Sequence, residues 1–295
     1  MFRLGAPIAA LSLSLLVMTG QAHAAPDDRD VAKLTSFGGT CANCDLAGRK
    51  LMNAKFAGAN FTKAILIGAD LRGAMFYGSN FLWADLSRSD LRGAEMRGAN
   101  FTNANFTDAR MSGVESSGAN FSQAVLVRVD LSSAELHGVR MIGANLQKAR
   151  LSNVELIAAD LSGANARDAD FSNADINHAN FQGGRFDGAS FRNADMTGSN
   201  LRGGIFNGAD FRNADLSLVV LSGADLSGAR GLDQDQLDEA CGDSSTRLPS
   251  GLSVRGCNGL RGTHFMLLRE VPRAPPAPPA PPAPPAPKAP KPPKW

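Results

Sequence analysis

Four cysteines are the clearest candidates for chemistry in this chain. Cys41 and Cys44 form a Cys-x-x-Cys pair, and Cys241 and Cys257 lie far along the sequence. A Cys-x-x-Cys pair can act as a redox dithiol or supply half of a zinc site. The redox role needs a thioredoxin-like βαβ context, which is lacking, and a zinc site would need the second pair of cysteines to reach the first. We therefore expect two disulfides, one joining Cys41 to Cys44 and one joining Cys241 to Cys257.

Other residues that support catalysis are sparse. Beyond residue 24 the histidines are His137, His178 and His264, and none is paired in the sequence with a serine or cysteine in a way that suggests a nucleophile. Glycine is frequent but belongs to a regular repeat, so no phosphate-binding loop is indicated. We predict a chain that is not an enzyme, with no catalytic residue, no metal site and no cofactor.

The first residues have the pattern of a secretory signal. Arg3 provides the positive region, residues 8–18 form a short apolar stretch, and Ala22-His23-Ala24 fits the small-x-small cleavage rule. Cleavage is predicted after Ala24, which places the protein in the periplasm or outside the cell, where disulfides persist. An uncleaved interfacial anchor is the alternative, because the apolar run is shorter than the roughly 20 residues of a membrane span.

The elements that position these residues follow a period of five. Large apolar residues recur at every fifth position from Leu46 to Leu226, without insertion or deletion, and we call them centres. A small residue lies two positions before each centre, and Asp or Asn often lies one position before it. This period matches neither the 3.6 residues of a helix nor the two of a strand. Only Ser116 and Ala166 break the series of large centres, and we expect a loose or kinked core there.

Five residues to a side, two of them pointing inward, describe a four-sided coil. Four pentads complete a coil of 20 residues, and roughly nine coils would stack about 4.8 Å apart. The predicted fold class is therefore an all-β solenoid. Residues 20 apart stack along one side, so phenylalanines should form internal columns that supply apolar burial: Phe61, Phe81, Phe101 and Phe121 in one, and Phe171, Phe191 and Phe211 in another.

The pentads carry a family resemblance. Ala69-Asp70-Leu71-Arg72-Gly73 and Ala214-Asp215-Leu216-Ser217-Leu218 match the A-(D/N)-L-x-x consensus, and the chain resembles the pentapeptide-repeat proteins. The resemblance implies a right-handed quadrilateral β-helix. The best-understood branch of that family mimics duplex DNA and binds DNA gyrase as a strongly acidic cytoplasmic rod, usually dimeric through its C-terminal end. This chain departs from that branch, with a net charge of +2 and an export signal.

The predicted organisation has six parts. Residues 233–240 are expected to form a short helix that caps the last coil with Leu232 and Leu237, and solenoids need caps because each coil contacts only its neighbours. The six parts are a signal peptide (1–24), an N-terminal linker (25–40), the β-helix (41–230), a C-terminal cap (231–258), a linker (259–273) and a disordered proline-rich tail (274–295).

Apolar residues at outward positions are the candidate partner contacts. They cluster on consecutive sides of the N-terminal coils, and clustered exposed apolar residues often mark partner sites: Ile65, Ile67, Tyr77, Leu82 and Trp83. A looser second group contains Val125, Val127, Ile142 and Ile157. The alternative is scattered surface hydrophobes, which are common. Asp-x-Arg pairs also line one side, and they indicate either an anion-binding strip or a solvated ladder of ion pairs.

The proline-rich tail suggests a second attachment device. Its Pro-Pro-Ala repeats favour polyproline II, and Lys288, Lys291, Lys294 and Trp295 follow them. These four residues are candidate contacts to an anionic envelope surface, although three lysines would give only weak, salt-sensitive binding. The alternative is a stiff spacer that binds nothing.

Three functions compete at this stage. The first is an exported binding or scaffolding rod that engages an unidentified protein partner in the periplasm. The second is an envelope-binding spacer attached through the tail, and the third is a gyrase-binding DNA mimic. We expect no nucleic-acid partner, since the surface charges are balanced and no basic stripe is evident. The ends of a rod would also permit an end-to-end homodimer.

Overall fold

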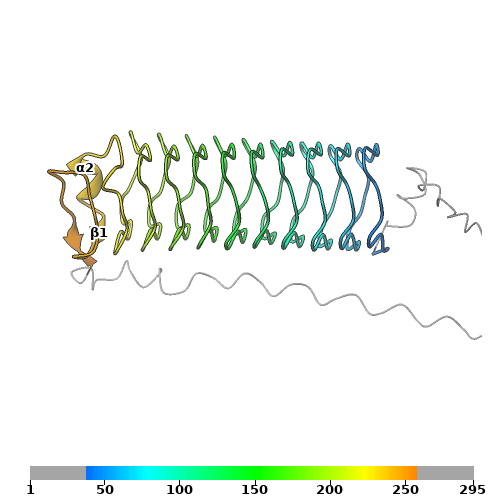
Figure 1. Ribbon diagram of the computed structural model, residues 1–295, viewed down its shortest axis with the longest axis horizontal. Helices are drawn as coiled ribbons and strands as arrows, with labels where there is room; N and C mark the ends of the chain where they lie inside the picture. The colour runs from blue at the N-terminus through cyan, green and yellow to red at the C-terminus, as the bar shows by residue number, and fades with distance from the viewer. Residues whose placement is uncertain (1–37, 258–295) are drawn as a thin grey trace, which may run out of the picture.

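The computed structural model describes residues 38–257, which form one straight solenoid (Figure 1). Each pentad contributes one parallel β-bridge and one two-residue turn, and each bridge between two repeats joins residues 20 apart, as Asp70 joins Asp90. Four bridges therefore make one four-sided coil. The ladder begins at Thr40, which pairs with Asn60, one residue earlier than the boundary expected from the sequence.

Backbone hydrogen bonds explain why a pentad forms one side. The amide of a centre donates to the next coil, as Leu71 N donates to Asp90 O at 2.7 Å, and the turn closes when Ala74 N donates to Leu71 O at 3.0 Å. The second turn residue has a left-handed backbone, for example Gly73 at φ 64°. Glycine and asparagine tolerate that conformation best, which accounts for their frequency at this position.

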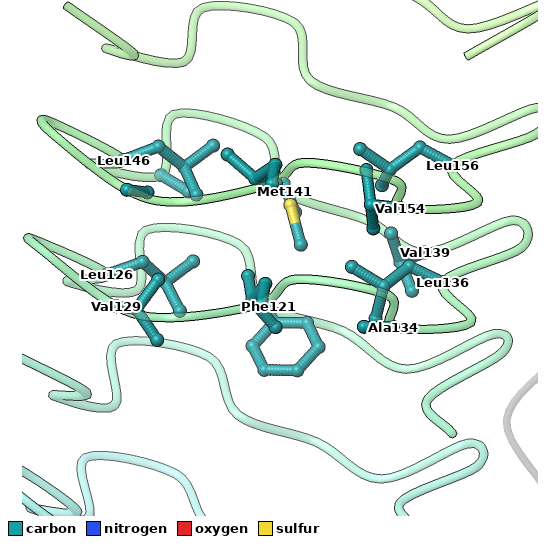
Figure 2. Packing of buried hydrophobic residues seen from close by; sticks show 14 of the residues in the cluster. Phe121, Leu126, Val129, Ala134, Leu136, Val139, Met141, Leu146, Val154 and Leu156 are labelled. Atoms are coloured by element: carbon teal, nitrogen blue, oxygen red, sulfur yellow. The ribbon is translucent and has the colours of Figure 1, made fainter. Parts of the chain in front are cut away.

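The core is a set of stacked columns inside the coils (Figure 2). Centres such as Phe121 and small residues such as Ala134 have essentially no exposed surface. The rings of Phe81, Phe101 and Phe121 are stacked at centroid distances of 5.0 and 4.8 Å. Only a small residue fits the other inward position: a Cβ on Gly184 would lie 2.6 Å from the Phe186 ring.

The two under-filled centres do not interrupt the rod. Ser116 N donates to Glu135 O at 2.9 Å and Ala166 N donates to Arg185 O at 2.7 Å, so the ladder runs through both positions. The expected kink is therefore wrong, because inter-coil hydrogen bonds hold the backbone even where a side chain is small. The cost is local, since the buried hydroxyl of Ser116 has no hydrogen-bond partner among the described residues.

The C-terminal end is closed by a short cap. Helix α2 (Gln234–Leu237) begins after the N-cap Asp233 and buries Leu237 against the last coil. The Gln236 side-chain amide donates to Phe211 O at 2.9 Å and to Ala214 O at 2.8 Å, which satisfies carbonyls that no further coil would reach. The helix is shorter than the expected 233–240, because Cys241 already returns to the ladder beside Val220.

Two disulfides lie at the two ends of the rod, between the pairs expected from the sequence. Cys41 joins Cys44 at the first coil, and Cys241 joins Cys257 in the cap. Strand β1 (Cys241–Gly242) pairs in parallel with strand β2 (Arg255–Gly256), so the second disulfide fastens the cap to the ladder.

Several sequence predictions fall outside residues 38–257. They are the signal peptide with its cleavage site after Ala24, the 259–273 linker and the 274–295 tail with Lys288, Lys291, Lys294 and Trp295. Within the described residues, no helix has the length and apolar character needed to cross a membrane.

Candidate functional site

The outer surface of the rod consists of four faces. The side chains one before and one after each centre lie side by side, as shown by Thr62 Oγ1 donating to Asn60 Oδ1 at 2.7 Å and by Arg72 pairing with Asp70. Because each bridge joins residues 20 apart, these pairs stack into columns along the rod. Each face can therefore be read from the sequence in steps of 20.

One face, which we call the Asp/Arg face, carries ion pairs. Arg72 donates two hydrogen bonds to Asp70, and Arg92 donates two to Asp90, all at 2.7–2.8 Å. Arg212 does the same to Asp210, whose side chain is almost fully buried. Five of the arginines on this face have carboxylate partners within the chain, so the face is mainly a ladder of ion pairs: Arg72, Arg92, Arg110, Arg192 and Arg212.

These contacts lower the pKa of the aspartates. The hydrogen bonds from Arg212 lower the pKa of Asp210, and the neighbouring arginines act in the same way on Asp70 and Asp90. Burial opposes the shift but is the smaller effect. A carboxylate with a lowered pKa in the folded state stabilises the fold above its unfolded pKa, and this stabilisation is lost as the pH falls through the lowered value.

Replacing Asp210 by asparagine is therefore expected to have a pH-dependent effect. At neutral pH the variant should lose about 1–2 kcal/mol of unfolding free energy, since the charge-assisted hydrogen bonds from the exposed Arg212 to a buried carboxylate are lost. The deficit should shrink as the pH falls below 3.8, the ordinary pKa of an aspartate, because the unfolded wild-type chain then begins to bind the proton. Urea unfolding at neutral pH and at about pH 2.5 measures both values. An equal deficit at both pH values would contradict the assignment.

A second face is an asparagine ladder. Asn100 Nδ2 donates to Asn80 Oδ1 at 3.1 Å, and Asn200 Nδ2 donates to Asn180 Oδ1 at 3.1 Å one hundred residues on. These amides are satisfied by one another, so this face offers little for a ligand to hydrogen-bond.

The apolar residues predicted as partner contacts occupy three consecutive sides of the rod. Ile65 and Ile67 lie together on one face, Leu82 lies on the asparagine face, and Trp83 stands at the corner between them. Ile65 pairs with Asp85, two residues after Trp83, so these four residues surround one corner. Tyr77 is separate, since it lies beside Met75 on the fourth face.

Trp83 is the most exposed large hydrophobic residue of the described chain, at 58%, and Ile65 is 40% exposed. Val125, Val127 and Ile142 repeat the pattern 60 residues later, which is three coils along the same corner. The apolar corner, defined by Ile65, Ile67, Leu82 and Trp83, therefore continues as a broken stripe.

The fourth face is acidic, and charge counting along the sequence did not reveal it. Seven successive coils place a carboxylate at the same position: Glu95, Glu115, Glu135, Glu155, Asp175, Asp195 and Asp215. Acidic and basic residues nearly balance over the whole repeat region, so only reading in steps of 20 exposes this column. No group of three or more His, Cys, Asp or Glu side chains among residues 38–257 is arranged to hold a metal ion.

One bridge and one turn per pentad, four pentads to a coil, define a four-sided β-solenoid built from five-residue units. The family model described as pentapeptide repeats matches this chain in 8 copies over residues 41–81, 54–93, 79–115, 117–153, 155–193 and 194–230. The chain belongs to the pentapeptide repeat family. A comparison with curated proteins finds no match.

Among solved structures, the chain is similar to HetL, a pentapeptide repeat protein involved in heterocyst differentiation regulation in the cyanobacterium Nostoc sp. strain PCC 7120. The identity is 26%, with 68% of this chain and 93% of HetL covered and a TM-score of 0.46. The plasmid-mediated fluoroquinolone resistance protein QnrB1 is 19% identical, with 65% of this chain and 92% of QnrB1 covered and a TM-score of 0.43. A pentapeptide repeat protein of the Arabidopsis thaliana thylakoid lumen is 32% identical, with 34% of this chain and 73% of that protein covered and a TM-score of 0.29.

Proposed function

We propose that this protein is an exported, non-catalytic binding rod that engages a protein partner in the periplasm through the apolar corner. The observation that carries the proposal is Trp83. It occupies the left-handed turn position at φ 60°, where the repeat elsewhere prefers glycine or asparagine, and its side chain is mostly exposed. Lys63, Arg88 and Leu218 share this conformation, so the repeat tolerates long side chains there. What distinguishes Trp83 is that it is the most exposed large hydrophobic residue of the described chain, which points to a contact outside the fold.

The neighbours of Trp83 complete a contact surface. Leu82 is half-buried beside it, and Ile65 and Ile67 lie one coil below around the same corner. Aromatic residues surrounded by aliphatic side chains are typical of the cores of protein interfaces. The rigid ladder holds these side chains in place, so binding would cost little ordering of the backbone.

Export rests on the signal-like residues 1–24 and is supported by the disulfides. Both cysteine pairs are within bonding distance at the two ends of the rod, and such structural disulfides persist in oxidising compartments. The tail-attached envelope spacer and the gyrase-binding DNA mimic remain alternatives. The first depends on residues outside the described range, and the second requires cytoplasmic protein.

Replacing Trp83 by glycine tests the proposed site. We expect the substitution to leave the unfolding free energy unchanged or slightly higher, since glycine suits the left-handed turn, and to abolish partner binding. A photocrosslinking amino acid at Leu82 of the exported protein should give a discrete adduct in cells, and Trp83→Gly should remove that adduct.

Two controls make this result specific. A crosslinker at Gln182, on the same face five coils away, should give no adduct. Met52→Ser removes another exposed hydrophobic residue, 48% exposed, from the Asp/Arg face and should leave the adduct at Leu82 unchanged. Equal adducts at Leu82 and Gln182, or full-length protein in the cytoplasm, would refute the proposal.

A further inference from the structure

The acidic face is only partly neutralised by its own neighbours. Arg97 pairs with Glu115, and His137 lies 2.7 Å from Glu155. The other five carboxylates of the column form no ion pair within residues 38–257: Glu95, Glu135, Asp175, Asp195 and Asp215. The turns that border this column carry His178 on one side. On the other side they carry four arginines that are paired with aspartates of the Asp/Arg face: Arg72, Arg92, Arg192 and Arg212. Between Glu95 and Asp175 the carboxylates without an ion pair therefore lie on every second coil, about 9.6 Å apart.

The sequence beyond the described residues has a matching period. Residues 258–295 contain six basic residues and one acidic residue, and Lys288, Lys291 and Lys294 are spaced by three. A polyproline II helix has three residues per turn and rises 3.1 Å per residue, so these lysines would share one side and repeat about every 9.3 Å. That spacing agrees with the two-coil interval between Glu95, Glu135 and Asp175 to about 0.3 Å.

The acidic column also ends at a site suited to an aromatic residue. Below Glu95 the same face carries Met75 in the column and Tyr77 beside it, both half-buried. Trp295 directly follows Lys294 in the sequence. If Lys294 lay opposite Glu95, Trp295 would come next to Met75 and Tyr77. A thioether and an aromatic ring are favourable neighbours for the indole of a tryptophan.

The last described residue lies over a face that adjoins the acidic face. Cys257, the last described residue, is bonded to Cys241 and lies 3.5 Å from Ser222, on the asparagine face that adjoins the acidic face. Thirty residues separate Cys257 from Lys288, and even the proline-rich part of them would span roughly 43 Å as polyproline II. The six coils from Asp215 to Glu95 span about 29 Å, so the tail is long enough to return along the rod.

We propose that the proline-rich tail of this chain docks on its own acidic face, antiparallel to the progress of the coils. The pairs follow from the matching periods and from the direction in which the tail must run: Lys288 with Asp175, Lys291 with Glu135, Lys294 with Glu95, and Trp295 with Met75 and Tyr77. Exposed ion pairs are individually weak, but a tether holds the tail at a millimolar effective concentration. The inference does not depend on the proposed partner site.

Trp295 provides the measurement. The chain has two tryptophans, so full-length protein carrying Trp83→Gly reports on Trp295 alone. Docking should reduce acrylamide quenching of Trp295 by at least about twofold relative to a peptide of residues 274–295, independently of protein concentration. The triple variant Glu95→Gln/Glu135→Gln/Asp175→Asn should restore the quenching of the peptide, as should high salt.

A matched control removes the same charge elsewhere. Asp85→Asn/Asp130→Asn/Asp170→Asn neutralises three carboxylates on the other faces and should leave Trp295 protected. Four outcomes would overturn the proposal: peptide-like quenching at low salt, equal effects of the two triple variants, protection that grows with protein concentration, or protection that appears only with phosphatidylglycerol vesicles. The third would indicate a second copy, and the fourth would indicate the envelope.

Discussion

Replacing Phe101 by alanine is expected to lower the unfolding free energy by about 3–5 kcal/mol. The ring is fully buried and lies 5.0, 4.8 and 5.3 Å, centroid to centroid, from the rings of Phe81, Phe121 and Phe106. Hydrogen bonds between coils fix the spacing of the backbone, so the coil cannot collapse around the gap. Chemical denaturation followed by far-ultraviolet circular dichroism measures the loss.

The control for this substitution lies on the surface of the same rod. Gln182→Ala removes an exposed side chain at a turn and should change the unfolding free energy by no more than about 0.5 kcal/mol. A loss below about 1 kcal/mol for Phe101→Ala would mean that the coils adjust to fill the space. The internal phenylalanine column would then stabilise the fold less than its packing indicates.

The inward half of this structure was predictable because a single rule determines it. A period of five with a large and a small inward residue leaves one way to bury both, so centres such as Leu71 and small residues such as Ala74 lie inside as predicted. The cap was harder to delimit. The length of α2 depends on where Cys241 can rejoin the ladder, and that contact is set by Val220 in the previous coil.

The neighbours of the outward side chains were harder to predict, because they depend on which residues of successive coils lie beside each other. The sequence places Tyr77 and Trp83 six residues apart, yet the coil turns a corner at Gly78, and Trp83 stands at the corner after that. The acidic column shows the converse case, since Glu95 and Glu135 are forty residues apart and share one face. Once four pentads per coil is known, a reading in steps of 20 recovers both relations.

The disulfide of the cap is expected to matter more than the one at the first coil. Cys241 and Cys257 are 16 residues apart, and the loss of a crosslink of that length costs about 3 kcal/mol in the loop-entropy model. Cys41 and Cys44 are only 3 apart, so the same model gives a smaller effect. The double variant Cys241→Ala/Cys257→Ala should therefore unfold at lower guanidinium concentration than Cys41→Ala/Cys44→Ala.

The consequence of opening the cap follows from the way a solenoid is stabilised. Each coil packs only against its neighbours, so an uncovered last coil exposes its apolar centres and can fray inward. Leu237 and the two hydrogen bonds from Gln236 remain after the disulfide is removed. The loop 241–257, which contacts α2 where Ser253 N donates to Gln234 Oε1 at 3.1 Å, is then no longer closed. Hydrogen exchange should then accelerate first near Leu221 and Leu226 and last in the central coils. Uniform acceleration along the rod would contradict this order, and equal destabilisation by both double variants would show that loop length does not decide the effect.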